Sequence, residues 1–223
     1  MTGASSPFAQ QIVFPPAQNV VQLSATGTVE VPQDLLSISM NTTRDGSDAS
    51  AVQNQLKSAI DAALVEAKKA AQPGQLDVRT GNFSLYPRYG RDGKPIGWQG
   101  SAELVLEGRD FARISSTAGK IQTLTIGSVG FGLSREQRTK VEGDAQGMAI
   151  ERFKARAAEI ARGFGFAGYT LREVNISAND QGFTPRPRMM AAEAKAASAD
   201  SALPVEAGKT SVVVTASGSV QLK

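Results

Sequence analysis

A strict alternation of apolar or small residues with polar residues, over eleven positions, limits most strongly how this 223-residue chain can fold. From Val21 to Val31, every odd position carries Val, Leu, Ala or Gly, and every even position carries Gln, Ser, Thr or Glu. A period of two is typical of a β-strand with one face buried and the other in water. Near the other end, Val212, Val214, Ala216, Gly218, Val220 and Leu222 also share one face, with polar residues between them from Thr215 on. Both stretches are therefore predicted to be half-buried strands.

The two terminal stretches also resemble each other position by position, LSATGTVEV over 23–31 and VTASGSVQL over 214–222. Two interpretations stay open at this point. Two strands with one wet face each could share these residues because they meet similar constraints. Alternatively, the first and last strands pair with each other, and Gly27 and Gly218 leave space for a closely packed helix.

Spacings of three and four between apolar residues predict three helices between these strands. The first begins after Ser47 or Asp48 and stops at Pro73-Gly74, and the second begins after Asp110. The third follows Ser134, which with Glu136 and Gln137 fits a capping box. The apolar residues predicted to form its buried edge are Ile150, Phe153, Ala157, Ile160 and Phe164.

The remaining patterned segments predict further strands, two of which are joined by Arg91-Asp92-Gly93-Lys94, a hairpin turn signal. The element order is then ββαββ-αβαββ, which contains two similar βαββ halves. Because residues along most of these strands alternate between a solvent-exposed face and a buried face, we predict an α+β fold with two layers, a mostly antiparallel sheet with helices on one face. We expect a single domain over 20–223, a flexible N-terminal leader over 1–19 and a mobile loop over 180–208, where periodicity is lost.

The chain contains neither cysteine nor histidine. This excludes disulfides, thiol nucleophiles, a Ser-His-Asp triad and imidazole metal ligands. The acidic residues of the third predicted helix alternate with Arg and Lys, which is typical of a solvated helix face. The glycine-rich segments match no phosphate-binding motif. We therefore expect no catalytic residue, no cofactor and no metal site, and a protein that is not an enzyme.

Two clusters combine residue types that are favoured at interaction surfaces. The first lies on the predicted hairpin and comprises Tyr86, Arg88, Tyr89 and Arg91, with Trp98 on the return strand; the second comprises Arg186, Arg188, Met189 and Met190. The first could cover a sheet edge, contact a protein or stack on single-stranded nucleic acid. The second could dock on a partner or a membrane surface, or simply be tolerated in a loop. No nucleic acid is expected, since the net charge of +3 comes from interleaved charges of both signs.

Several motifs, in this order and spacing, resemble the SIMPL-domain family, which includes periplasmic immunogenic proteins. They are Gly27–Asp34 (GTVEVPQD), Thr80–Tyr89 (TGNFSLYPRY), Gly97-Trp98, Phe131–Ser134 (FGLS), Pro185-Arg186-Pro187 and the closing alternating strand. The resemblance extends from Val20 to Leu222. It implies an α+β fold and a protein of the periplasm or associated with the outer membrane, made with a signal peptide that is then removed.

The resemblance also implies homo-oligomers, ring-like or channel-like, with peripheral association to a membrane or the envelope. A role in stress tolerance or envelope integrity is implied as well. It supplies no enzymatic activity and no catalytic residues. The alternative hypothesis is a monomeric periplasmic binding module for a small ligand or peptide held between the two halves. A nucleic-acid-binding protein is the less favoured third hypothesis.

Overall fold

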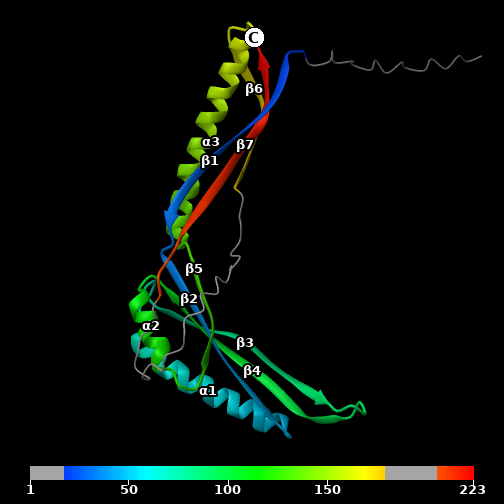
Figure 1. Cartoon of the computed structure of the whole chain (residues 1–223), viewed down its shortest axis with the longest axis vertical. Helices are drawn as coiled ribbons and strands as arrows, with labels where there is room; N and C mark the ends of the chain where they lie inside the picture. Colours follow the sequence, from blue (N-terminus) through cyan, green and yellow to red (C-terminus); the bar gives the residue numbers. More distant parts are fainter. Residues whose placement is uncertain (1–17, 179–204) are drawn as a thin grey trace, which may run out of the picture. The chain divides into compact units, whose positions relative to one another are not determined.

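The computed structural model describes residues 18–178 and 205–223, and these residues form three helices and seven strands (Figure 1). In chain order they are β1 (Val20–Pro32), β2 (Leu35–Gly46), α1 (Ala49–Ala70), β3 (Asp77–Tyr89), β4 (Pro95–Gly108), α2 (Phe111–Lys120), β5 (Thr125–Gly132), α3 (Arg135–Gly163), β6 (Tyr169–Ala178) and β7 (Lys209–Leu222). The predicted α+β class and element order are confirmed. Residues 1–17 of the predicted leader and 180–204 of the predicted loop lie outside the described residues.

The strands divide between two antiparallel sheets. One has the order β3-β4-β2-β5 and the other the order β1-β7-β6. The two βαββ halves predicted from the element order therefore do not form separate sheets. β5 of the second half lies in the four-stranded sheet with the strands of the first half, apart from β6 and β7. β5 pairs with β2, from Leu35 opposite Gly132 to Asn41 opposite Thr125, while the first and last strands of the chain pair with each other.

The chain forms two compact units, and neither is a continuous segment. Among the described residues, the smaller unit comprises 18–28, 144–178 and 213–223, and the larger comprises 29–143 and 205–212. The smaller unit holds most of the three-stranded sheet and the C-terminal part of α3. The larger unit holds the four-stranded sheet with α1 and α2.

In the larger unit, α1 and α2 cover one face of the four-stranded sheet. Asp48 caps α1 by accepting a hydrogen bond from the amide of Ala51, and Asp110 caps α2 by accepting one from Arg113. Both caps satisfy amides that a helix start leaves without a partner. The core between helices and sheet includes the fully buried side chains Leu36, Ile38, Met40, Val52, Leu56, Leu76, Leu104, Leu106 and Ile114.

In the smaller unit, α3 approaches β1 at backbone contact distance. A Cβ atom at Gly27 would lie 1.9 Å from the carbonyl oxygen of Ala145 and 2.7 Å from the amide nitrogen of Ala149. The terminal strands do pair, as the second interpretation of their likeness predicted, and Gly27 does admit the helix. Gly218 has a different role, because a Cβ there would meet the carbonyl oxygen of Glu173 on the neighbouring strand β6.

The close approach of α3 determines which of its side chains are buried. The buried row repeats every four residues and consists mainly of alanine: Ala145, Ala149, Phe153, Ala157 and Ala161. The prediction that Phe164 ends this buried edge is wrong, since α3 stops at Gly163 and Phe164 is 71% exposed. A helix this close to a glycine leaves room mainly for small side chains, so Phe153 is the one large residue in the row, and the predicted members Ile150 and Ile160 are only half-buried.

Candidate functional site

The β3–β4 hairpin carries the first predicted interaction cluster. Its turn is held by two backbone hydrogen bonds, from Gly90 to the Lys94 carbonyl and from Gly93 to the Gly90 carbonyl. Gly93 has φ of +72°, a conformation that favours glycine. The predicted Asp-Gly hairpin is therefore confirmed.

The structure brings four of the five predicted hairpin residues to the exposed end of this element. Tyr86 and Tyr89 are 49% and 61% exposed. The Tyr86 hydroxyl donates to Oε1 of Gln99 over 3.1 Å, and Arg88 lies 3.6 Å from the Asp45 carboxylate. Arg91 lies exposed in the turn and makes no ion pair within the described residues.

Trp98 is placed differently from the other hairpin residues. It pairs with Pro87 on one side and Gly46 on the other, and its half-buried side chain packs against the core beneath α1. Gly100, two residues further along β4, faces Leu56 of α1, so Trp98 lies on this helix side of the sheet. Tyr86 pairs with Gln99 and therefore lies on the opposite face.

Two apolar residues missing from the predicted cluster also lie exposed on the hairpin. Phe83 is 49% exposed on β3 and Ile96 is 60% exposed on β4. The signal for Ile96 was available in the sequence, because it lies two residues after the turn at Arg91–Lys94, close to its exposed neighbours. We call Phe83, Tyr86, Tyr89 and Ile96 the hairpin surface, which includes both faces of the hairpin: Phe83 pairs with Ala102 and lies on the helix side, whereas Tyr86 lies on the opposite face. The second predicted cluster, Arg186, Arg188, Met189 and Met190, lies outside the described residues.

A carboxylate network lies on the outer face of the four-stranded sheet. The Ser39 hydroxyl donates to Oε1 of Glu103, and the Asn82 amide donates to Oε2 over 3.0 Å. These two hydrogen bonds, that from Ser39 first, hold the pKa of Glu103 below its ordinary value of 4.5. The network keeps a charged carboxylate on the sheet, and the lowered pKa makes Glu103 a weaker base toward Ser39 than an ordinary glutamate.

Asp34 joins the end of β1 to the start of α3. Its carboxylate accepts hydrogen bonds from the Ser134 amide over 2.7 Å and the Ser134 hydroxyl over 2.6 Å. Ser134 in turn caps α3 by accepting a hydrogen bond from the Gln137 amide over 3.3 Å, as the capping box predicted. In a capping box the side chain of Gln137 would accept a hydrogen bond from the Ser134 amide. Here Asp34, a hundred residues away in the chain, accepts that hydrogen bond instead.

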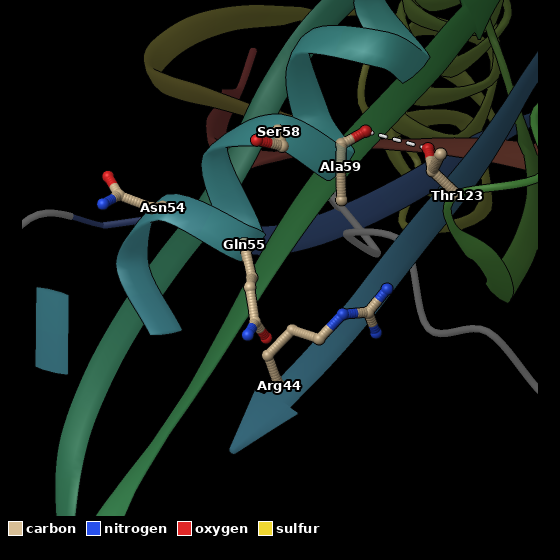
Figure 2. Close-up of a pocket in the computed structure, with 6 residues that line it drawn as sticks. All are labelled: Arg44, Asn54, Gln55, Ser58, Ala59 and Thr123. Carbon is tan, nitrogen blue, oxygen red and sulfur yellow. Dashed lines mark hydrogen bonds between the residues drawn. The ribbon is translucent and has the colours of Figure 1, made fainter. Parts of the chain in front are cut away.

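The larger unit also has a shallow polar depression of about 470 Å³, shown in Figure 2. It is lined by Arg44, Asn54, Gln55, Ser58, Ala59 and Thr123. Gln55 reaches from α1 toward Arg44 on β2, and the Thr123 hydroxyl donates to the Ala59 carbonyl over 2.8 Å. Arg44 donates from Nη1 to the Thr42 hydroxyl and the Thr43 carbonyl, and forms no ion pair with any described side chain.

Two further shallow depressions have polar linings. One of about 420 Å³ lies beside Asp34 and Asp110, and one of about 490 Å³ lies over the three-stranded sheet beside Glu173. Among residues 18–178 and 205–223 no group of three or more acidic side chains is placed to hold a metal ion. None of the helices in these residues combines the length and apolar character needed to cross a bilayer.

Comparison with known proteins gives one informative match. No curated protein matches the chain. One solved structure similar to it is described as "The crystal structure of AtUAH in complex with glyoxylate", with 13% identity over 59% of this chain and 34% of that chain, and a TM-score of 0.28. The chain thus spans about a third of that protein's length, and a likeness this weak carries no argument. The model of the SIMPL family, described as "Protein of unknown function (DUF541)", matches residues 21–220, and the chain therefore belongs to the SIMPL family.

Proposed function

We propose that this protein is a non-enzymatic component of the cell envelope, in the periplasm or associated with the outer membrane, that assembles with copies of itself. The observation that supports the proposal best is the hairpin surface. Four large apolar or aromatic side chains, each about half exposed or more, lie on one projecting element beside Arg88 and Arg91. Aromatic residues with arginine are the residue types enriched where interfaces carry most of their binding energy.

The chemistry of the described residues points the same way. A chain without Cys and His has to use carboxylates, Lys, Tyr or Ser for acid–base or nucleophilic work. On the sheet face of the larger unit, Glu103 accepts a hydrogen bond from the Ser39 hydroxyl. The pKa of Glu103 is lowered, which is the wrong direction for a general base near neutral pH. A ring-like or channel-like assembly with a role in envelope integrity or stress tolerance is the specific form that we propose.

Sedimentation velocity of paired variants tests the role of the hairpin surface. Tyr89→Ser combined with Ile96→Ser removes its two most exposed members, whereas Val65→Ser removes a residue on α1 that is 63% exposed. Loss of two interface anchors worth about 2 kcal/mol each would weaken assembly by roughly a thousandfold, while Val65→Ser leaves it unchanged. Equal assembly of both variants would contradict the hairpin surface as a contact.

The depression in Figure 2 favours a second candidate function, a binding module for a small anionic ligand. Arg44, Gln55 and Ser58 surround it with one cation and neutral hydrogen-bonding groups, which suits a carboxylate or phosphate. In a thermal-shift screen with inorganic phosphate, acetate and citrate, a ligand at about 100 times its Kd adds about 2.7 kcal/mol of stability. The stabilisation should disappear in Arg44→Gln, and a screen without any stabilised sample would remove this candidate.

A further inference from the structure

Strand β6 is an edge strand with an exposed apolar row. Within the described residues it has a partner on one side only, the antiparallel strand β7. Leu171, Val174 and Ile176 are 54%, 44% and 40% exposed. An unpaired strand edge with apolar side chains is a template for pairing with another strand.

A β-bulge at Arg172 brings these apolar residues onto one face. The pairing with β7 shifts between Leu171 and Glu173, so the alternation of side chains is offset by one residue. Leu171, Val174 and Ile176 lie opposite Val220, Gly218 and Ala216. Val220 and Ala216 are buried, so the row on β6 continues the buried face of the sheet.

Helix α3 covers this face over β1 and leaves the row on β6 exposed. Gly27 admits the helix onto β1, and Arg152 and Arg156 donate to the carbonyls of Thr26 and Ser24 over 2.7 and 3.4 Å. Those two hydrogen bonds also occupy carbonyls of β1, the opposite edge strand of the same sheet. β6 is therefore the better edge of this sheet for strand addition.

The β6 sequence is complementary to itself when two copies run antiparallel. With a two-fold axis between Arg172 and Glu173, each Arg172 faces Glu173 of the second copy. The neighbouring pairs are then Leu171 with Val174, Thr170 with Asn175 and Tyr169 with Ile176. The bulges fall opposite each other, so apolar residues meet on one face. Neither Arg172 nor Glu173 forms an ion pair within the part of the chain that the structure describes, so both charges are available.

We propose that β6 pairs antiparallel with β6 of a second copy of this chain, joining two three-stranded sheets into one six-stranded sheet. The interface is isologous, since the same residues face each other on both sides of the axis. Main-chain hydrogen bonds and the apolar row supply affinity, and the two Arg172–Glu173 pairs set the register. This inference rests on the proposed self-assembly and names a contact that is separate from the hairpin surface.

Because the natural chain has no cysteine, two single substitutions can report the register. Leu171→Cys and Val174→Cys are placed in two chains with tags of different length, co-expressed and oxidised mildly. In the proposed register the two Cβ atoms lie about 5 Å apart. Identical residues lie about 10 Å apart, beyond the reach of a disulfide. We expect the mixed dimer to exceed either same-variant dimer at least about tenfold. Leu171→Cys with Val65→Cys is the matched control.

Charge reversal gives a second readout. Arg172→Glu places two Glu–Glu contacts across the axis and should weaken the dimer at least about tenfold, and Arg172→Glu/Glu173→Arg should restore it. A mixed disulfide no more abundant than the Val65 control, in a wild-type protein that still oligomerises, would overturn the β6 contact and leave the proposed function standing. A wild-type protein that is monomeric throughout would overturn the proposed self-assembly itself.

Discussion

Replacing Gly27 by alanine should destabilise the smaller unit more than its single methyl group suggests. The new Cβ would lie 1.9 Å from the Ala145 carbonyl oxygen, with the Ala149 amide nitrogen also within 2.7 Å. Both obstacles are helix backbone, so no side-chain rotation relieves the contact and α3 has to move away from β1. Overpacking of this kind costs about 3 kcal/mol, at the upper end of its usual range.

Gly147→Ala provides a control of opposite sign in the same unit and on the helix itself. A Cβ at Gly147 meets nothing within 4 Å, and alanine is favoured over glycine in a helix interior by about 1 kcal/mol. For a chain of this size about 1 kcal/mol corresponds to about 2–4 °C. We expect Tm to fall by about 6–12 °C in Gly27→Ala and to rise by about 2–4 °C in Gly147→Ala.

Thermal unfolding followed by circular dichroism at 222 nm measures both variants, because α3 supplies much of the helical signal. If Gly27→Ala unfolded within about 1 °C of the natural protein, the close backbone contact between β1 and α3 would be refuted. A Tm change that small corresponds to a loss of less than about 0.5 kcal/mol. A fall in Tm for Gly147→Ala would contradict the open surroundings of that position.

Three further predictions concern the larger unit. The lowered pKa of Glu103 stabilises the fold above its ordinary value of 4.5, and this contribution is lost as pH falls through the folded-state pKa. The gap in urea midpoint between the natural protein and Glu103→Gln should therefore shrink from pH 7 to pH 3, and a constant gap would contradict it. Asp34→Asn loses a charged acceptor at the Ser134 cap and should cost about 1–2 kcal/mol in urea unfolding, against less than about 0.5 for the exposed control Asp61→Asn. Gly93→Ala should cost about 1 kcal/mol because of its positive φ, and Gly93→Asn should cost less; equal losses would argue against this explanation.

The strands, helices and caps could be predicted because their signals are local. The alternation over 21–31, the caps at Asp48 and Asp110, and the Asp-Gly turn each act within a few residues. The division into two sheets could not be predicted in this way. Period two indicates a strand with one buried face, and says nothing about whether β5 pairs with β2 or with β6.

Long-range contacts explain the other differences. Asp34 and Ser134 are a hundred residues apart, so no spacing rule joins them. The prediction groups Trp98 with Tyr86 because both are aromatic and close in the chain. Successive residues of a strand point to opposite faces, so Trp98 lies on the face opposite to Tyr86 and its partner Gln99, and packs against the core. Phe164 is exposed because α3 stops one residue before it, and the spacing of apolar residues alone did not determine where the helix stops.

The mass of the natural protein in solution tests the proposed self-assembly most directly. Light scattering coupled to size exclusion should give a mass that is a multiple of the 23.4 kDa chain mass and that falls on dilution as subunits dissociate. A mass of 23.4 kDa at every concentration, up to the highest that stays in solution, would contradict the proposal.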